Sequence, residues 1–265
     1  MRAERWLSAA ILGLATLIGL SAFAYPLLVQ REGDGLTALA HSSDASLITL
    51  VLTLLCVGAV VASFTSRQMG ARSVAVLGVL TAVNAVLRAL PGPGGFSAIF
   101  FLLALCGYVY GSTFGFLMGA LSLLVSALIG GGVGPWLPYQ MFTTGWMGLT
   151  SGWLPDIARH RRAELAMLVL WTITWGFVFG VIMNLWFWPY ISAAQSAPDQ
   201  TWQAGLGLTD ALRRYGLFYL ATSALWDATR AFGNALLVIL FGGQLLKVLR
   251  RFRRVLGFEV TSEPR

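Results

Sequence analysis

Eight apolar runs dominate the chain, and each is long enough, or nearly so, to cross about 30 Å of hydrocarbon as a helix. Only one long hydrophilic stretch, about 190–214, interrupts this pattern. The fourth run is short and is bracketed by Gly95 and Gly111, which predicts a helix that is tilted, kinked or shielded by its neighbours. We expect transmembrane helices over 6–29, 46–65, 73–90, 96–110, 113–130, 138–154, 165–188 and 216–246.

Composition agrees with this pattern. Of the 265 residues, 57% are hydrophobic and 11% are charged, whereas a soluble domain carries about 25% charged residues. The predicted fold class is therefore an all-α integral membrane protein in contact with the lipid bilayer. The net charge of +7 would suggest nucleic acid as the partner of a soluble protein, but here we expect none.

The placement of the basic residues orients the predicted bundle, because Lys and Arg accumulate in cytoplasmic loops. With the N-terminus inside, thirteen of the eighteen Lys and Arg residues fall on the cytoplasmic side. Both termini are therefore expected in the cytoplasm. The first run also has a competing interpretation as a cleaved signal peptide of about residues 1–24, with "MRAER" as its basic start and Ala22 and Ala24 at the cleavage site.

Motifs for catalysis and for metal or nucleotide binding are missing from the sequence. No G-x-x-x-x-G-K-[ST] occurs, and the one lysine, Lys247, follows the last run. His41 and His160 fall on opposite sides of the predicted membrane, while Cys56 and Cys106 lie inside apolar runs as small buried residues. We expect no catalytic residue, no metal site and no cofactor in this chain.

Five polar residues recur along the last run with spacings of 4, 4, 3 and 4: Tyr219, Ser223, Asp227, Arg230 and Asn234. This spacing predicts one face of a helix. Ionisable residues inside a membrane are costly, and their default interpretation is functional. We expect this polar stripe to form the floor of a site for a small organic molecule. The alternative is a structural Asp227–Arg230 pair that neutralises itself.

Other aromatic and polar residues are expected at the same depth, near the outer ends of several runs, where they would wall such a site. Trp186 and Trp188 are equally consistent with an interfacial aromatic belt. Arg230 is four residues from Trp226, close enough for a cation-π contact. The predicted wall residues are Phe96, Trp136, Tyr139, Gln140, Asn184, Trp186, Trp188 and Trp226.

Three stretches carry a resemblance to a known family. They are "GYVYGSTFGFLMGALSLLVSALIGGG" from Gly107, "GPWLPYQMF" from Gly134, and "WDATRAFGN" from Trp226. Together they resemble the substrate-specific (S) component of energy-coupling factor (ECF) transporters, the vitamin-uptake branch of the ABC systems. The resemblance covers about 73–246 and implies a six-helix core. The two preceding runs have no counterpart in this core. They would form either an extra contact with a partner subunit or a lipid-facing addition with no role in transport.

The resemblance implies a domain order of 1–69 as a two-helix extension, 70–250 as the S-component-like domain, and 251–265 as a basic tail. It also implies a prokaryotic plasma membrane as the location. The implied partners are a vitamin, a transmembrane coupling (T) subunit and two cytoplasmic ATPases. A small-residue face of the first core helix would dock on the T subunit, or would serve internal helix packing. That face is Gly78, Ala82, Ala85 and Ala89.

The sequence thus predicts a binding subunit, not an enzyme, that captures a vitamin for ATP-driven import by its partners. Overall likeness to corrinoid-type members makes cobalamin the first candidate, while thiamine precursors and riboflavin stay open. Two alternatives remain. A proton-coupled secondary transporter would work without ATP, although no inverted repeat is evident. A membrane enzyme acting on a lipid or prenyl substrate usually needs a metal-binding carboxylate cluster or a nucleophile with its base, whereas this sequence offers one intramembrane carboxylate.

Overall fold

The computed structural model describes residues 2–28, 45–65, 70–90, 92–191, 196–203 and 205–255. These residues are mostly helical, and no strand occurs among them. The long helices are α1 (Arg2–Leu28), α2 (Ala45–Thr65), α3 (Ala71–Ala89), α4 (Ile99–Tyr110), α5 (Ser112–Ser126), α6 (Leu137–Ser151), α7 (Arg161–Phe187), α8 (Leu208–Thr222), α9 (Ala224–Leu237) and α10 (Gly243–Val255). Short helical turns are η1 (Pro93–Gly95), η2 (Ala127–Gly131), η3 (Trp188–Tyr190), η4 (Pro198–Gln200) and η5 (Val238–Gly242).

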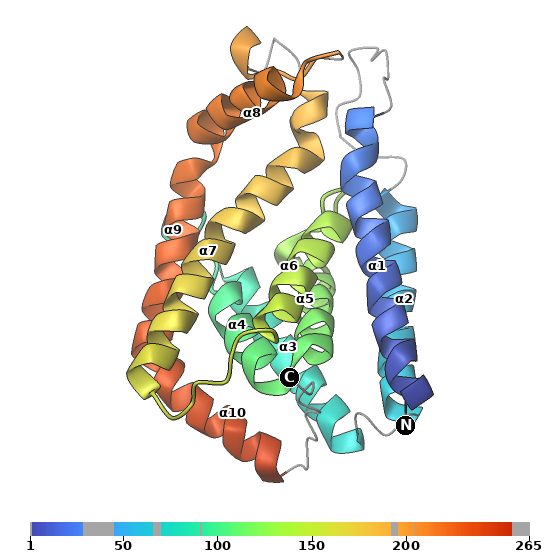
Figure 1. Cartoon of the computed structure of the whole chain (residues 1–265), viewed down its shortest axis with the longest axis vertical. Coiled ribbons are helices and arrows are strands. Elements are labelled where there is room, and N and C mark those ends of the chain that lie inside the picture. The colour runs from blue at the N-terminus through green and yellow to red at the C-terminus, as the bar shows by residue number, and fades with distance from the viewer. Residues whose placement is uncertain are drawn as a thin grey trace.

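The helices form an elongated bundle in which α8 lies across one end and α10 lies obliquely at the other (Figure 1). Helix α1 begins at the α10 end of the bundle. Five segments are long and apolar enough to cross a membrane, while the apolar stretches described in α1 and α2 are shorter. The predicted all-α membrane class is confirmed, whereas eight crossings and the cytoplasmic termini stay predictions. The five segments are Ala71–Ala89, Pro93–Tyr110, Ser112–Gly131, Arg161–Tyr190 and Ala224–Val255.

Helix α4 is the central helix of the bundle. All of its residues are buried except Tyr108, which is half-buried. Neighbouring helices therefore shield the short fourth run, as its length suggested. Gly111 adopts a φ of 95° at the corner between α4 and α5, a conformation that an L side chain rarely adopts. This corner turns the chain directly from α4 into α5.

Glycines allow α5 and α6 to approach at backbone contact. A Cβ at Gly115 would overlap the Gly148 carbonyl, and a Cβ at Gly119 would overlap the Thr144 carbonyl. Such close approach is typical of small residues in membrane helices, where van der Waals packing drives association. Gly115 and Gly119 of the "GSTFGFLMGA" stretch therefore serve helix packing.

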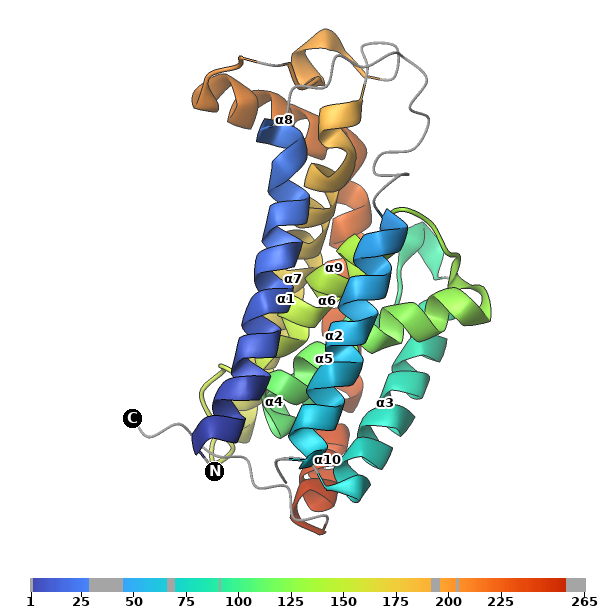
Figure 2. The same ribbon diagram turned by 90° about the vertical axis from the view of Figure 1, so that its right-hand side faces the viewer.

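The two N-terminal helices lie side by side and contact α5 and α6 (Figure 2). Gly19 of α1 sits against the rings of Phe142 and Trp146, and the Trp146 indole N–H donates to Thr16 Oγ1 over 3.3 Å. The extension thus packs on the core helix α6. Its contact with a partner or with lipid, the two roles expected for it, stays a prediction.

The prediction of one continuous helix over 216–246 is wrong. The chain leaves helical geometry at Ser223, where φ is −128° and ψ is −28°, so α8 and α9 are separate helices. A π-helical turn, η5, then divides α9 from α10. Apolar residues continue through the break at Ser223 and through η5, which is why hydropathy alone did not locate them. As a consequence, Tyr219 of the predicted stripe belongs to α8, while Asp227, Arg230 and Asn234 belong to α9.

A buried carboxylate fastens α10 to the core. Glu164 of α7 is 2% exposed and pairs with Arg250 of α10, and its Oε1 also accepts a hydrogen bond from the Tyr108 hydroxyl at 2.8 Å. The Tyr110 hydroxyl donates to the carbonyl of Leu249 at 3.1 Å. These contacts fix the rotation of α10 about its own axis.

Replacing Arg250 with methionine should destabilise the protein by about 3 kcal/mol, because the buried Glu164 carboxylate loses its counterion. Adding Glu164→Gln should recover most of this loss, since the neutral amide can still meet the Tyr108 hydroxyl. Thermal unfolding of both variants in detergent measures the effect. Equal melting temperatures for the single variant and the wild type would show that the ion pair does not hold α10.

Candidate functional site

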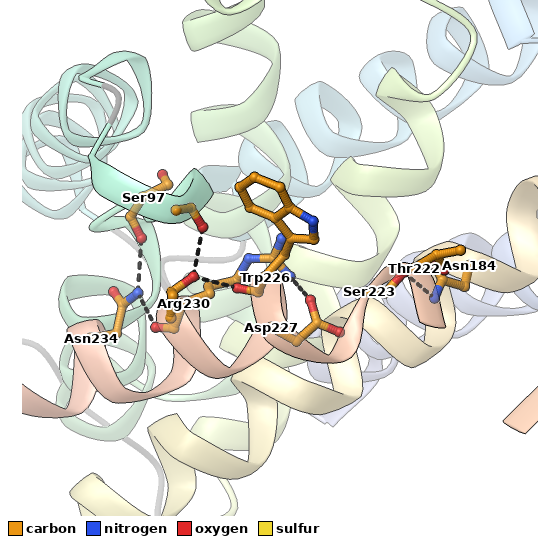
Figure 3. Close-up of polar contacts among 10 residues, drawn as sticks. Ser97, Asn184, Thr222, Ser223, Trp226, Asp227, Arg230 and Asn234 are labelled. Carbon is orange, nitrogen blue, oxygen red and sulfur yellow. Dashed lines mark hydrogen bonds and ion pairs between the residues drawn. The ribbon is translucent and has the colours of Figure 1, made fainter. Parts of the chain in front are cut away.

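The candidate site centres on an ion pair in the first two turns of α9. Arg230 Nη1 lies 2.6 Å from Asp227 Oδ1, and the two side chains are 19% and 3% exposed (Figure 3). The negative residue is near the helix N-terminus, where the helix dipole favours it. The predicted Asp227–Arg230 pair therefore exists, and it leaves one carboxylate oxygen for other contacts.

Glycines of α7 make room for this pair. A Cβ at Gly180 would overlap the Asp227 carboxylate, and a Cβ at Gly176 would overlap the backbone of Ala231. Helix α7 therefore packs directly on the polar face of α9. The space occupied by the carboxylate exists because residue 180 has no side chain.

Two aromatic rings hold the Arg230 guanidinium. Its Cζ lies 4.9 Å from the centroid of Phe179 and 5.9 Å from that of Phe100, which is within cation-π distance. The stacking on Trp226 that the four-residue spacing suggested is wrong. Trp226 instead packs on Gly95 of the segment between α3 and α4, while the rings that face the guanidinium come from α4 and α7.

Two buried polar atoms beside the pair lack hydrogen-bond partners. They are Asp227 Oδ2 and the Tyr219 hydroxyl. The hydroxyl lies next to the carboxylate and feels its charge. Burial, followed by the charge of Asp227, raises the pKa of Tyr219 above its ordinary value, so this phenol stays protonated. Unsatisfied buried polar atoms are costly, and a ligand with matching donors and acceptors would satisfy them.

Asn234 joins α9 to the start of α4 through hydrogen bonds. It is fully buried, and its Oδ1 accepts hydrogen bonds from the backbone N–H groups of Phe100 and Phe101 at 3.1 and 3.0 Å. Its Nδ2 donates to the carbonyls of Ser97 and Arg230 (Figure 3). Because Ala98 offers α4 no side-chain cap, Asn234 caps α4 from α9. These four bonds occupy its amide group, although a ligand contact stays a prediction.

The segment 92–98 folds onto the same half of α9. The Thr229 hydroxyl donates to the carbonyl of Gly94 at 2.6 Å. The ring of Phe96 lies against Gly233, where a Cβ would overlap it. Trp226, Thr229 and Gly233 therefore lie on one face of α9, and the segment 92–98 with Phe96 covers that face.

Asn184 and Ser223 contact each other at the break between α8 and α9. Asn184 Nδ2 donates to Ser223 Oγ at 2.8 Å, and Ser223 Oγ can donate to Asn184 Oδ1 at 3.1 Å (Figure 3). The pair joins α7 to the start of α9. These two predicted site residues thus lie one turn from Asp227 and stabilise the break itself.

The remaining predicted residues lie apart from the ion pair. Trp188 is buried and donates from its indole N–H to the carbonyl of Gln200 at 2.8 Å. Tyr139 is fully buried between the rings of Phe23 at 4.9 Å and Trp186 at 6.1 Å. Trp136 is a half-buried residue at the start of α6. No contact among those described links these three to Asp227 or Arg230.

Sequence reasoning missed Arg88 of α3. Its Nη2 donates to Gln140 Oε1 at 2.8 Å, and its Nη1 donates to Ser126 Oγ at 2.8 Å and to the carbonyl of Gly131 at 3.5 Å. Among the residues that the structure describes, no carboxylate lies within ion-pair distance of it. The spacing of Thr81, Asn84 and Arg88 could have revealed this inward polar face, because it matches one side of a helix.

The arrangement offers recognition chemistry. Around the first turns of α9 it combines a fixed guanidinium and a carboxylate oxygen with a protonated phenol from α8 and aromatic rings from α4 and α7, the elements of a small-molecule site. The described residues contain no group of three potential metal ligands among His, Cys, Asp and Glu.

Comparison with known proteins identifies the family of this chain. The family described as "ECF transporter, substrate-specific component" matches residues 72–242. This range contains α3 to α9 almost completely and excludes α1, α2 and α10. Searches of the curated proteins and of the solved structures gave no match. Since the match covers well over half of the 265 residues, the chain belongs to the family of ECF transporter substrate-specific components.

Proposed function

We propose that the chain captures a vitamin-like compound at the α8 end of the bundle, using the ion pair of α9, for ATP-driven import by partner subunits. Membership of the family makes it a substrate-binding membrane subunit. The observation that carries the location of the site is the buried Asp227 carboxylate, whose Oδ2 has no partner beside an equally unpaired Tyr219 hydroxyl.

The polar atoms at this place favour a ligand with both donors and acceptors. Arg230 can present planar N–H donors to a carbonyl, carboxylate or phosphate. Asp227 Oδ2 can accept from an amide or amine, and Tyr219 can do either. A corrinoid, with its peripheral amides, is the first compound to test. That choice rests on overall likeness to corrinoid-type members, and thiamine precursors and riboflavin fit the same chemistry.

Arg88 adds a second fixed cation, in the last turn of α3 before the chain leads into the segment 92–98. The charge of Arg230 is balanced by Asp227, whereas Arg88 contacts only neutral acceptors among the described residues. An anionic group on a ligand would therefore gain more from Arg88. Gln140, predicted as a site residue, would act by holding this guanidinium in place.

The partners would be a T subunit and two ATPases, since the chain has no P-loop of its own. Of the predicted docking residues on α3, Gly78 and Ala82 are exposed, Ala89 is half-buried and Ala85 is fully buried. Ala75 is also exposed, so the exposed face of small residues on α3 consists of Ala75, Gly78 and Ala82. Small residues allow close helix approach, so this face suits a transmembrane partner.

Replacing Arg230 with methionine should weaken vitamin binding by about 1.5 to 3 kcal/mol, the value of a charge-assisted hydrogen bond. Asp227→Asn should cost less if its amide still holds the guanidinium. The measurement is calorimetric titration of each purified variant with cyanocobalamin, thiamine and riboflavin, in parallel with thermal melting. Arg88→Met in the same series separates loss of an anion contact from loss of the α9 pair.

The double variant Asp227→Asn with Arg230→Met is the control for a purely structural pair. It removes both charges together, so it leaves no unpaired ion inside the bundle. A stable double variant that binds with full affinity would exclude the ion pair from the site. Reduced binding at an unchanged melting temperature is the expected result.

Replacing Ala82 with leucine should block assembly with the T subunit, because the larger side chain prevents close helix approach. Vitamin binding by the isolated subunit should be unchanged, while ATP-dependent uptake should fall. Val83→Leu, on an exposed neighbouring position of α3, is the matched control. Normal uptake by the Ala82 variant would mean that another face contacts the partner.

A further inference from the structure

Helix α10 carries an exposed apolar flank. Val248, Phe252 and Val255 are exposed, by 47%, 49% and 67%. Their spacing of 4 and 3 places them on one side of the helix. Nothing in the vitamin site or in the α3 face uses these side chains.

The adjacent flank of α10 is basic. Lys247, Arg251 and Arg254 are exposed, and the same spacing of 4 and 3 places them together. On the helical wheel the two flanks lie on either side of the core-facing residues Leu246 and Leu249, which are buried. The helix therefore has three faces, one buried in the protein, one apolar and exposed, and one cationic.

The rotation of α10 is fixed, so the two flanks point in defined directions. Arg250 pairs with the buried Glu164, and the carbonyl of Leu249 accepts from Tyr110. Helix α10 also departs from the line of α9 and runs obliquely under the bundle (Figure 1). It is thus held at one end of a membrane protein with an apolar flank and a cationic flank both uncovered.

We propose that α10 is an interfacial helix whose basic flank binds the headgroups of anionic phospholipids while its apolar flank enters the acyl chains. A membrane surface with anionic lipids presents negative charge and hydrocarbon side by side. A helix with one cationic and one apolar side is typical of that interface, and clusters of basic residues beside a membrane-crossing helix attract anionic lipids. A nucleic acid would match the cationic flank but not the apolar one.

The test uses the full-length chain reconstituted in vesicles of phosphatidylcholine, alone or mixed with phosphatidylglycerol. A fluorophore is attached to Phe252→Cys or, in a second variant, to Arg254→Cys. Cys56 and Cys106 are buried, so the new thiol is the reactive one. Lipids with brominated acyl chains quench a fluorophore that contacts them. We expect quenching at 252, much less at 254, and stronger quenching at 252 by brominated phosphatidylglycerol than by brominated phosphatidylcholine.

A second part of the test removes the charges of the basic flank. The variant combines Lys247→Gln, Arg251→Gln and Arg254→Gln with the label at 252. The preference for phosphatidylglycerol should fall by about fivefold for each charge removed, the equivalent of about 1 kcal/mol. The matched control neutralises Arg159, Arg161 and Arg162, which are exposed but belong to the start of α7 and the residues before it; this triple should keep the preference. High salt should weaken the preference without ending contact with phosphatidylcholine.

Three results would overturn the proposal. Equal quenching at 252 and 254 would mean that α10 does not lie at the interface with its apolar flank inward. An unchanged lipid preference in the Lys247, Arg251 and Arg254 variant would mean that headgroup charge is not recognised. Shielding of the label at 252 from both lipids would mean that protein covers this face.

Discussion

A charge inside hydrocarbon costs several kcal/mol unless it is paired and hydrogen-bonded, and the architecture around α9 follows from this cost. Asp227 and Arg230 neutralise each other, and the missing side chain of Gly180 leaves room for the carboxylate. The rings of Phe179 and Phe100 hold the guanidinium. The pairing is incomplete, because Asp227 Oδ2 stays unsatisfied. That unsatisfied oxygen is the reason why we propose this pair as a recognition site as well as a structural one.

The same constraint acts on the backbone. In a membrane, the free N–H groups at a helix start need partners within the protein. The buried start of α4 has no cap of its own, and Asn234 supplies one from α9. Asn234 therefore joins the start of α4 to the turn of α9 that carries Arg230. At the α10 end, Glu164 pairs with Arg250 and helps to fix α10.

Hydropathy and spacing predicted much of this structure but not its breaks. The all-helical membrane class, the buried fourth helix and the Asp227–Arg230 contact followed from apolar runs and from three-residue spacing. The interruption at Ser223 did not, because a break whose polar groups are met by Asn184 from α7 leaves no gap in hydropathy. The partners of Asn234 and Arg88 were equally hidden, since they are up to 137 residues away in the chain. The local sequence shows which polar groups need hydrogen-bond partners, but the identity of each partner depends on how the helices pack.

The central claim is that the chain holds a small molecule at the α9 ion pair, and mass spectrometry of compounds released from the purified protein tests it most directly. The protein is prepared in parallel as wild type and as the Asp227→Asn, Arg230→Met double variant, and each is denatured to release what it carries. The account predicts one vitamin-like compound in amounts matching the wild-type protein, and its loss from the variant. Equal amounts of the same compound in both preparations, or only lipid and detergent from the wild type, would contradict it.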